Sequence, residues 1–586
     1  MTALLTVLAY ALFGLRLLLQ PFFAPAPHLL TDPFLQLPSP TSVQVVWFSE
    51  FNGKSHQVQY GNNLEQIAIA KTTKLSRVRE DQQSNIGNPE TDGQPYSKPT
   101  YREIWRHEAA VTDLQPNQRL PYRVQSTRED GQVLQSDRFT LAPTPTTNQP
   151  LKILLTSDHQ LMPMTPANLQ KVVETVGQVD VVLMAGDLVN VPDRASEWFD
   201  DSRGGAFFPS LQGRARYELE RGGIKTRYQG GAIIQSAPLF TALGNHEVMG
   251  RFSLDTPLND QFNDPIPSQA VEPLYQQVSK QINPTDDPML WQNWMKNHTF
   301  NSDTYEEIFS LPNTSPGGKK YYAVTFGGIR LISLYATNIW RVPSLEPDAR
   351  GRYRERDADL ADPLRWGYGQ HIFEPIAPGS PQYNWLQSEL NSPEFQQAKY
   401  KIVMLHHPPH SLGDNIVPAY TNPVQIIDRF ANGQIKSVRY EYPLAQDYLI
   451  RDVIPLLENA GVQLVHYGHS HLWNRFISPS GMHFLETSNV GNSYGAFIGN
   501  QRRNSPIGFK ETYAVTGDPN GLEPIVPTLN PLQDENQNNL PYIASNDITV
   551  FSILETGSGI VSSYRFDTSK PNSEVVKFDQ FLLGRQ

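Results

Sequence analysis

Five short polar segments, each following directly on an apolar run, constrain this chain more than any other feature. The runs are KILLT, VDVVLMA, PLFTAL, KIVML and VQLVHY, and their length and β-branched content predict buried strands. Because ligands of open α/β sheets bind at the carboxyl ends of strands, the segments predict a shared site at one edge of a sheet. They read SDHQ (157–160), GDLVN (186–190), GNHE (244–247), HHPPH (406–410) and GHSH (468–471).

These segments offer oxygen and imidazole donors to a metal. The 586-residue chain contains no cysteine, so neither a disulfide nor a thiolate site can form. Such donors suit Zn, Fe or Mn, and two ions ~3.5–4 Å apart can clamp a phosphoryl group and activate water. The sequence therefore predicts a two-metal hydrolase of phosphate esters, with Asp187 bridging the ions. The other candidate ligands are Asp158, Asn245, His406, His469 and His471.

The overall charge excludes one class of partner. The formal net charge is −11 and the sequence pI is about 5.7. A nucleic-acid scaffold protein needs a basic surface for backbone phosphates, so no such binding is expected. A small phosphate ester remains compatible with this charge, because bound metal ions reverse the local sign.

The N-terminal segment is almost wholly apolar. Residues 1–23 read MTALLTVLAYALFGLRLLLQPFF. We expect residues 1–27 to be a secretory signal or a membrane anchor, which places the protein in the periplasm, outside the cell or on a membrane. The alternative is a buried N-terminal helix.

The next part of the chain is predicted to be all β. Residues 28–146 contain alternating, aromatic-rich runs such as SVQVVWFSEF and SHQVQYG, separated by turn signals. This spacing is typical of a β-sandwich of immunoglobulin type. The polar segment 71–99 is expected to be a long loop, and the Pro/Thr-rich segment 142–150 a domain linker.

Beyond the linker the pattern changes to alternating strands and helices. KILLT, a helical segment that begins near Thr165 as a cap, and VDVVLMA predict a right-handed βαβ unit with parallel strands. DITVFSILE and GIVSSYRF predict an antiparallel pair that closes the sheet. Insertions at 191–236 and 251–304 leave from strand ends, so we expect them to form lids or walls of the site.

The order of the five motifs resembles the calcineurin-like metallophosphoesterase superfamily. GNHE followed by GHSH is the specific part of this signal, whereas GD alone is common turn chemistry. The β-rich segment ahead of the motifs resembles the purple acid phosphatase branch, which carries an N-terminal fibronectin type III-like domain. The resemblance implies an α/β (α+β sandwich) catalytic domain over residues 147–586, behind a fibronectin type III-like β-sandwich over residues 28–146.

The resemblance also implies a role for each motif residue. In this family a metal-bridging hydroxide attacks the phosphate ester. One metal would be held by Asp158, Asp187 and His471, and the other by Asp187, Asn245, His406 and His469. His246 would contact the substrate and help the leaving group depart, and His410 is a candidate for a further substrate contact.

Two positions depart from the family pattern. Gln160 stands where most members have a histidine, and Asn190 stands where the purple branch has a tyrosine. Either side-chain amide oxygen is a candidate ligand for the first metal, and this chemistry suits Mn, Fe(II) or Ca. The resemblance thus implies two divalent or trivalent ions of Fe, Zn or Mn, with the first shell altered.

These departures leave an alternative of a different class. A catalytically weakened relative would act as an extracellular binding module, with its β-sandwich on a partner or glycan and one metal kept for structure. Gln160 and Asn190 favour the binding module. The enzyme is favoured by six intact residues: Asp187, Asn245, His246, His406, His469 and His471. Metal analysis separates the two, because the enzyme requires two ions per chain.

Overall fold

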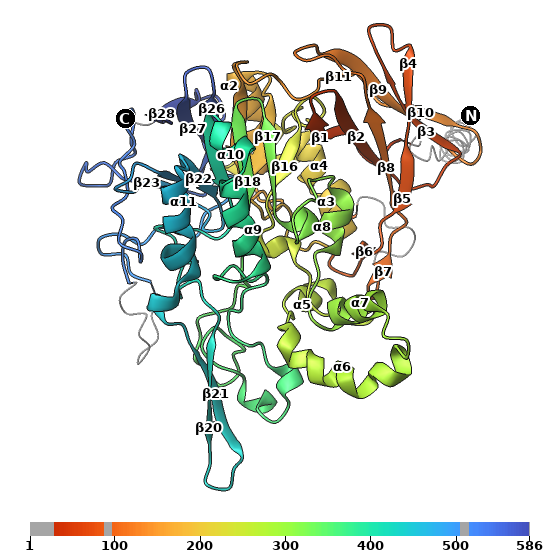
Figure 1. Ribbon diagram of the computed structural model, residues 1–586. Coiled ribbons are helices and arrows are strands. Elements are labelled where there is room, and N and C mark those ends of the chain that lie inside the picture. The colour runs from red at the N-terminus through yellow and green to blue at the C-terminus, as the bar shows by residue number, and fades with distance from the viewer. Residues whose placement is uncertain (1–27, 87–95, 504–514, 585–586) are drawn as a thin grey trace, which may run out of the picture.

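The computed structural model describes residues 28–86, 96–503 and 515–584, and Figure 1 shows the order of their helices and strands. The predicted signal or anchor at 1–27 lies outside the described residues. Within the described part of the chain, no helix is both long enough and apolar enough to cross a bilayer.

The N-terminal region forms two antiparallel sheets. β5 (Lys71–Lys74) and β6 (Arg79–Glu80) lie where the sequence predicts a loop over 71–99, so that prediction is wrong at these strands. β6 pairs with β7 (Thr100–Tyr101). Short polar strands such as KTTK have no apolar alternation to mark them. The sheets run β1 (Phe34–Ser39), β2 (Ser42–Ser49), β8 (Trp105–Val111), β5 (Lys71–Lys74), and β10 (Val133–Gln135), β9 (Leu120–Thr127), β3 (Ser55–Tyr60), β4 (Gln66–Ile69), with β11 (Phe139–Leu141) beside β9.

Strand β2 of the first of these sheets is buried on both faces. Successive side chains of a strand point to opposite faces, so β2 has two apolar faces. Val45 and Trp47 pack in the core between the two N-terminal sheets. Val46 and Phe48 belong to the core of the catalytic region, where the ring centroid of Phe48 lies 5.4 Å from that of Phe208. The N-terminal sheet is therefore fixed to the catalytic region by apolar packing.

The catalytic region contains two larger mixed sheets. The six-stranded sheet runs β16 (Leu239–Thr241), β13 (Val181–Met184), β12 (Lys152–Thr156), β26 (Ile548–Glu555), β27 (Ile560–Asp567), β28 (Val576–Leu582). The seven-stranded sheet runs β17 (Tyr322–Phe326), β18 (Ile329–Ser333), β19 (Tyr400–Met404), β22 (Leu464–Tyr467), β24 (His483–Thr487), β23 (Trp473–Ile477), β25 (Tyr542–Ile543). The predicted fold class is confirmed: mixed α/β sheets follow an N-terminal β region.

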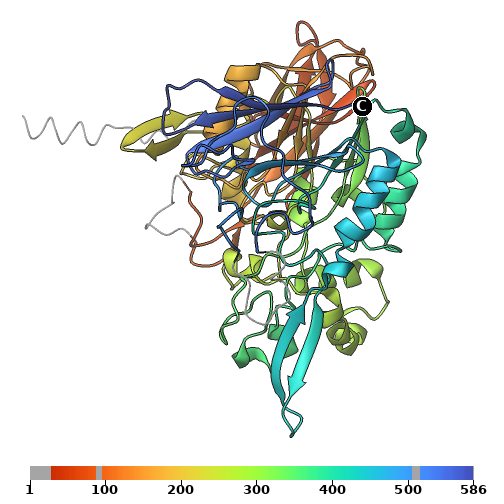
Figure 2. The same cartoon turned by 90° about the vertical axis from the view of Figure 1, so that its left-hand side faces the viewer.

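Helices cover the outer face of the seven-stranded sheet, as Figure 2 shows for α9 (Pro381–Leu390), α10 (Pro393–Gln397) and α11 (Ile454–Ala460). Val403 of β19 packs on this side with Leu386 and Leu457 of the helices. Ile402 and Met404 point the other way, into the core between the two sheets. Helix α2 (Thr165–Val176) packs against β26 of the other sheet.

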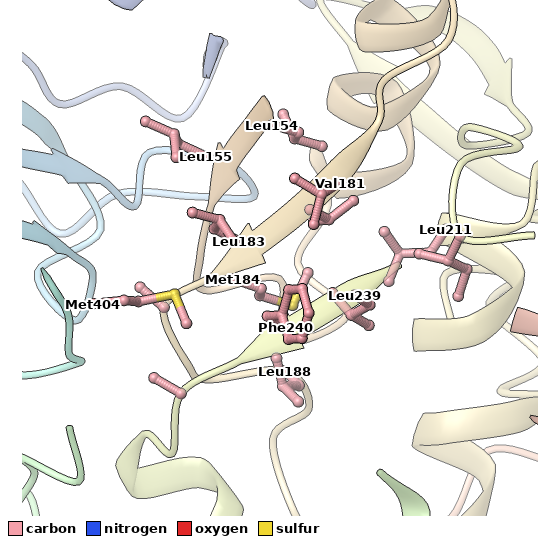
Figure 3. Close-up of a cluster of buried hydrophobic side chains, with 14 of the residues drawn as sticks. Leu154, Leu155, Val181, Leu183, Met184, Leu188, Leu211, Leu239, Phe240 and Met404 are labelled. Carbon is pink, nitrogen blue, oxygen red and sulfur yellow. The ribbon is translucent and has the colours of Figure 1, made fainter. Parts of the chain in front are cut away.

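The core between the sheets is continuous and apolar. Figure 3 shows Leu155 and Leu183 on the same side as Met404 of the other sheet. Leu154 and Leu211 lie on the opposite side of those strands in the same view. The strands that carry the motifs are thus buried on both faces, which fits their unbroken apolar runs.

The motif-bearing strands belong to both sheets, so the prediction of one shared sheet edge is wrong. SDHQ, GDLVN and GNHE follow β12, β13 and β16 of the six-stranded sheet, which pair in parallel. HHPPH and GHSH follow β19 and β22 of the seven-stranded sheet, which also pair in parallel. The predicted βαβ unit is confirmed, as is the antiparallel closing pair β26–β27. Thr165 begins α2 without capping it, because its hydroxyl donates to the carbonyl oxygen of His159.

The remaining elements lie in the two insertions, in one projecting hairpin and in short 3-10 or π segments. Residues 191–236 hold α3 (Ala195–Phe199), α4 (Phe207–Leu211) and the hairpin β14 (Tyr217–Arg221)–β15 (Ile224–Tyr228). Residues 251–304 hold α5 (Leu258–Phe262), α6 (Ser268–Ile282), α7 (Pro288–His298) and the start of α8 (Asp303–Ile308). The projecting hairpin is β20 (Val424–Arg429)–β21 (Ile435–Glu441), seen at the bottom of Figure 1. Short 3-10 or π segments are η1 (Asn245–Glu247), η2 (Gly318–Lys320), η3 (Asp357–Asp359), η4 (Pro363–Arg365), η5 (Leu444–Gln446) and η6 (Leu449–Val453).

Candidate metal centre and active site

The polar loops that follow the strands adopt a strained backbone. Asp158, Asp187, His469 and His471 have φ angles of 52°, 56°, 85° and 53°. Residues other than glycine rarely occupy this left-handed region, and such strain clusters at functional sites. The backbone here turns sharply at each strand end, and four candidate ligands sit on those turns.

Glycines of the motifs allow the loops to approach the two carboxylates. A Cβ added at Gly244 would lie 2.2 Å from Oδ1 of Asp187, and one added at Gly468 would lie 2.2 Å from Oδ2 of Asp158. Any other residue at these positions would collide with a candidate ligand. The glycine in GNHE and in GHSH is therefore required by close packing against a carboxylate from another motif.

Three possible hydrogen-bond acceptors surround Nε2 of His406. Its Nδ1 lies 2.8 Å from the carbonyl oxygen of Ala185, which can only accept, so Nδ1 carries the ring proton. Nε2 faces Oδ1 of Asn245 at 3.2 Å, Nδ1 of His469 at 3.0 Å and Oδ2 of Asp187 at 3.2 Å. Acceptors gathered this closely require a cation among them.

The pKa shifts of His406 and Asp187 also favour a positive charge in the site. Burial alone would lower the pKa of His406, but the charges of Asp187 and Asp158 raise it to about 10. Burial alone would raise the pKa of Asp187, but the imidazoles of His406 and His246 bring it below its usual range. The pocket thus stabilises a carboxylate together with a positive charge, and a metal ion supplies that charge with better geometry than a proton.

Two of the ligands expected for the first metal, Asp158 and His471, lie beside this group. Nε2 of His471 is 3.4 Å from Oδ1 of Asp158, and its Nδ1 is 2.5 Å from Oδ1 of Asn492. Burial lowers the pKa of His471 to about 4, so its imidazole is neutral and available as a ligand at neutral pH. The backbone N–H of His469 donates to both oxygens of Asp158 and links this pair to the group around His406.

The donor set fits a metal. Among the described residues, Asp187, His406 and His469 form a buried group whose ligand atoms all lie within 4.8 Å of one another. Nε2 of His469 and Oε1 of Gln160 are buried with no hydrogen-bond partner in the described chain. Buried polar atoms are nearly always paired, so these two atoms are available to an ion. The amide nitrogen of Gln160, not this oxygen, faces Asp187, and Gln160 as a ligand of the first metal stays a prediction.

Gln160 and Asn190, the two departures from the family pattern, have different surroundings. Nε2 of Gln160 lies 3.4 Å from Oδ2 of Asp187, inside the site. The side-chain amide of Asn190 instead donates to the backbone carbonyl oxygen of Gln160 at 2.6 Å. Asn190 therefore supports the loop that carries Gln160, and the structure shows no contact between its side chain and the other candidate ligands.

His246 lies at the mouth of the centre with its ring held on two sides. Its Nδ1 is 2.7 Å from the carbonyl oxygen of Asn190, and its ring stacks on Phe262 at 4.9 Å between centroids. Its backbone N–H donates to Oδ1 of Asp187 at 3.0 Å. This contact fixes Nδ1 as a donor, and a role of Nε2 toward a substrate stays a prediction.

His410 has a different environment. Its Nδ1 pairs with Oδ2 of Asp518 at 2.8 Å, and its ring packs against Phe484. It is not among the described residues that line the cavity beside the metal centre. A substrate contact by His410 stays a prediction.

Sequence reasoning assigned no role to Glu247, the last residue of GNHE. Its buried carboxylate accepts hydrogen bonds from the backbone N–H groups of Asp187 (2.9 Å), Leu188 (2.8 Å) and Gly244 (2.7 Å). Burial and the nearby Asp187 raise the pKa of Glu247 to about 7. Its adjacency to Asn245 and His246 was the only sequence signal. Glu247 is a positioning residue that ties two ligand loops together.

Glu486 does the same for the loops of the second sheet. It accepts from the backbone N–H of Ser470 at 3.0 Å, the hydroxyl of Ser411 at 2.7 Å and the amide of Asn474 at 2.8 Å. No motif marks it, because it lies inside a short strand, β24, of sequence HFLET.

Replacing Glu247 by alanine should destabilise the protein strongly. The change leaves three buried N–H groups without their acceptor, at ~1–3 kcal/mol each. We expect the free energy of unfolding to fall by about 3 kcal/mol or more, measured by denaturant titration. Glu174→Ala is the control: Glu174 is exposed on α2, and its loss should cost less than about 0.5 kcal/mol. A similar small change for both variants would contradict the role of Glu247.

A cavity of about 460 Å³ opens beside the metal centre. This volume is typical of a small-molecule site. Phe262, Asn263 and Pro265 line it, so the 251–304 insertion supplies one wall. The ligand candidates that reach it are Gln160, Asp187, Asn245, His469 and His471, together with His246.

Comparison with known proteins places this site in a family. The family model of calcineurin-like phosphoesterases matches residues 151–472, which is more than half of the chain and spans all five motifs. No curated protein sequence matches the chain.

Two solved structures illustrate the range of structural likeness. Purple acid phosphatase PPD1 from yellow lupin (Lupinus luteus) seeds matches with a TM-score of 0.50 at 13% identity, over 94% of this chain and 73% of that one. Astrotactin-2, a conserved vertebrate-specific and perforin-like membrane protein, matches with a TM-score of 0.13 at 11% identity over 25% of each chain, too little to carry an argument. The predicted resemblance is confirmed: this chain belongs to the calcineurin-like phosphoesterase family and shares the fold of purple acid phosphatase.

Proposed function

We propose that this protein is a two-metal hydrolase of small phosphate esters. The observation that carries the proposal is the convergence of Asp187, Asn245, His406 and His469 on one point, beside Asp158 and His471. Asp187 faces His406, its Oδ2 lies 3.4 Å from Nε2 of Gln160, and it is the proposed bridge. Asp158, Gln160 and His471 complete the shell of the first ion.

The two ions, when bound, would polarise the phosphoryl oxygens and lower the pKa of water. The chain's own residues bind and orient the ester. The cavity walls limit the access of solvent to the phosphate, and the amide of Asn415 holds the His469 loop by donating to its carbonyl oxygen at 2.8 Å. His246, with Nδ1 fixed on the carbonyl oxygen of Asn190, delivers a proton from Nε2 to the leaving oxygen.

Metal removal and replacement test the proposal. Dialysis against a chelator should abolish turnover of 4-nitrophenyl esters of phosphate, and addition of Fe, Zn or Mn should restore it. The apoprotein should retain its fold by circular dichroism, because the sheets and the apolar core do not depend on the ions. Turnover that survives complete metal removal would contradict the proposal.

A further inference from the structure

Five aromatic side chains line the cavity beside the metal centre. Its described lining includes Phe262, Trp340, Phe373, Tyr494 and Phe497. Trp340 and Tyr494 remain 41% and 63% exposed, although both are large and apolar enough to be buried elsewhere. Tyr494 packs against the candidate ligand His471 with ring centroids 4.6 Å apart. Exposed rings on a cavity wall are platforms for an aromatic or apolar group of a ligand.

Apart from the ions that the proposed function requires, the described cavity wall offers no cationic side chain to balance a second negative charge on the substrate. Apart from the candidate ligand Asp187, Asp414 is the carboxylate of this wall, and the described lining contains no Lys or Arg. Arg503 interacts with the charge of Asp414, but its guanidinium donates to the carbonyl oxygen of Gly413, and it does not line the cavity. A monoester is a dianion above its second pKa of ~6, whereas a diester keeps one charge.

A second cavity adjoins the first. It has a volume of about 390 Å³ and shares His246, Phe262 and Asn263 with the aromatic cavity. Apart from Val191, its other described wall residues are polar or charged, with Gln83, Asn85, Arg194, Glu197 and Arg203 among them. A phosphate held at the metal centre therefore has an aromatic space and a polar space next to the same histidine, one for each arm of a diester.

We infer that the site prefers phosphodiesters to monoesters, with an aromatic or apolar arm in the cavity of Trp340 and Tyr494. The inference rests on the proposed function. Water oxygen forms the new bond to phosphorus while the bond from phosphorus to the leaving oxygen breaks. One proton of the water ends on the leaving alcohol, the other goes to solvent or to the product, and the product is a monoester that keeps one arm. Asp414 then repels this dianionic product and favours its release.

Three nitrophenyl substrates separate charge from shape. They are 4-nitrophenyl phosphate, methyl 4-nitrophenyl phosphate and phenyl 4-nitrophenyl phosphate, assayed at pH 8 with the metal-loaded protein. We expect kcat/KM to be largest for the phenyl diester, smaller for the methyl diester and smallest for the monoester. The phenyl and methyl diesters carry equal charge, so their ratio reports the aromatic cavity alone.

Two variants assign these preferences to named residues. Asp414→Asn should raise kcat/KM of the monoester relative to the methyl diester by about tenfold, because one repulsion is removed. Trp340→Ala should lower the phenyl-to-methyl ratio by about fivefold, and Trp340→Phe should restore most of it. Asp260→Asn is the charge control: Asp260 is exposed on α5, outside the cavity lining, and both ratios should stay unchanged.

The possible results distinguish a failure of the diester inference from a failure of the proposed function. A monoester preference in the wild type, or ratios that Asp414→Asn and Trp340→Ala leave unchanged, would overturn the inference while the proposed function stands. No hydrolysis of any of the three substrates with Fe, Zn or Mn would overturn the proposed function, and the inference with it.

Discussion

Asp187→Asn should lower turnover of phosphate esters on the order of 10³-fold or more, the scale expected when a principal electrostatic term is lost. Asparagine keeps the shape of the side chain but removes the charge that holds two cations together. Asp187 also faces His406 and accepts from the backbone N–H of His246, so the same change loosens the centre. We expect the variant to lose at least one ion, measured by metal analysis alongside steady-state kinetics.

The control for this variant lies at the other end of the same strand. Asp180 precedes β13 and accepts from the backbone N–H of Lys152 at 2.8 Å, far from the ligand loops. Asp180→Asn removes the same charge by the same substitution and should retain activity within about twofold, as expected for a site away from the chemistry. Near-normal turnover of Asp187→Asn with both ions bound would remove Asp187 from the bridging position.

His246→Ala should act on chemistry after metal binding. A general acid contributes about 10²–10⁴-fold, and its contribution is greatest when the leaving oxygen most needs a proton. Alkyl phosphate esters should therefore lose about 10²-fold or more in kcat, whereas nitrophenyl esters should lose much less. The metal content should stay unchanged, because the contact from His246 to Asp187 is made by the backbone N–H.

A histidine of the 251–304 insertion provides the comparison. His298 lies on α7, stacks on Trp294 and is absent from the described cavity lining. His298→Ala should leave the ratio between alkyl and nitrophenyl esters at its wild-type value. Equal losses on both substrate types in His246→Ala would argue against proton delivery by His246.

The ligand set was predictable from sequence because its signal is local. The motifs that hold the candidate ligands each follow a short apolar run typical of a buried strand. The parallel pairing of β12 with β13 brings Asp158 and Asp187 to the same end. Their order along the chain then resembles one family. None of this required knowledge of contacts between distant segments.

The arrangement of the sheets was not predictable in the same way. β26, nearly four hundred residues later in the chain, pairs antiparallel with β12 and occupies the position that β19 would need in a single sheet. Such long-range pairing leaves no periodic trace in the motif strands. The five motifs therefore come from two sheets, although the side chains still meet.

The walls of the cavity were also beyond sequence reasoning. Trp340, Asp414 and Tyr494 come from three separate loops, and no spacing relates them. Glu486 lies inside a short strand, where its buried hydrogen bonds are visible only in three dimensions. The fibronectin type III-like character of residues 28–146 and the export of the chain stay predictions.

The central claim is that two ions act together in this site, and a metal titration tests it most directly. Metal-free protein would be titrated with Mn²⁺ or Zn²⁺ while bound metal and turnover of a 4-nitrophenyl diester are followed in the same samples. The account predicts little turnover at one equivalent and a steep rise as the second ion binds, to a total of two per chain. Saturation at one ion, or two bound ions with no turnover, would contradict it and favour a binding module with a structural metal.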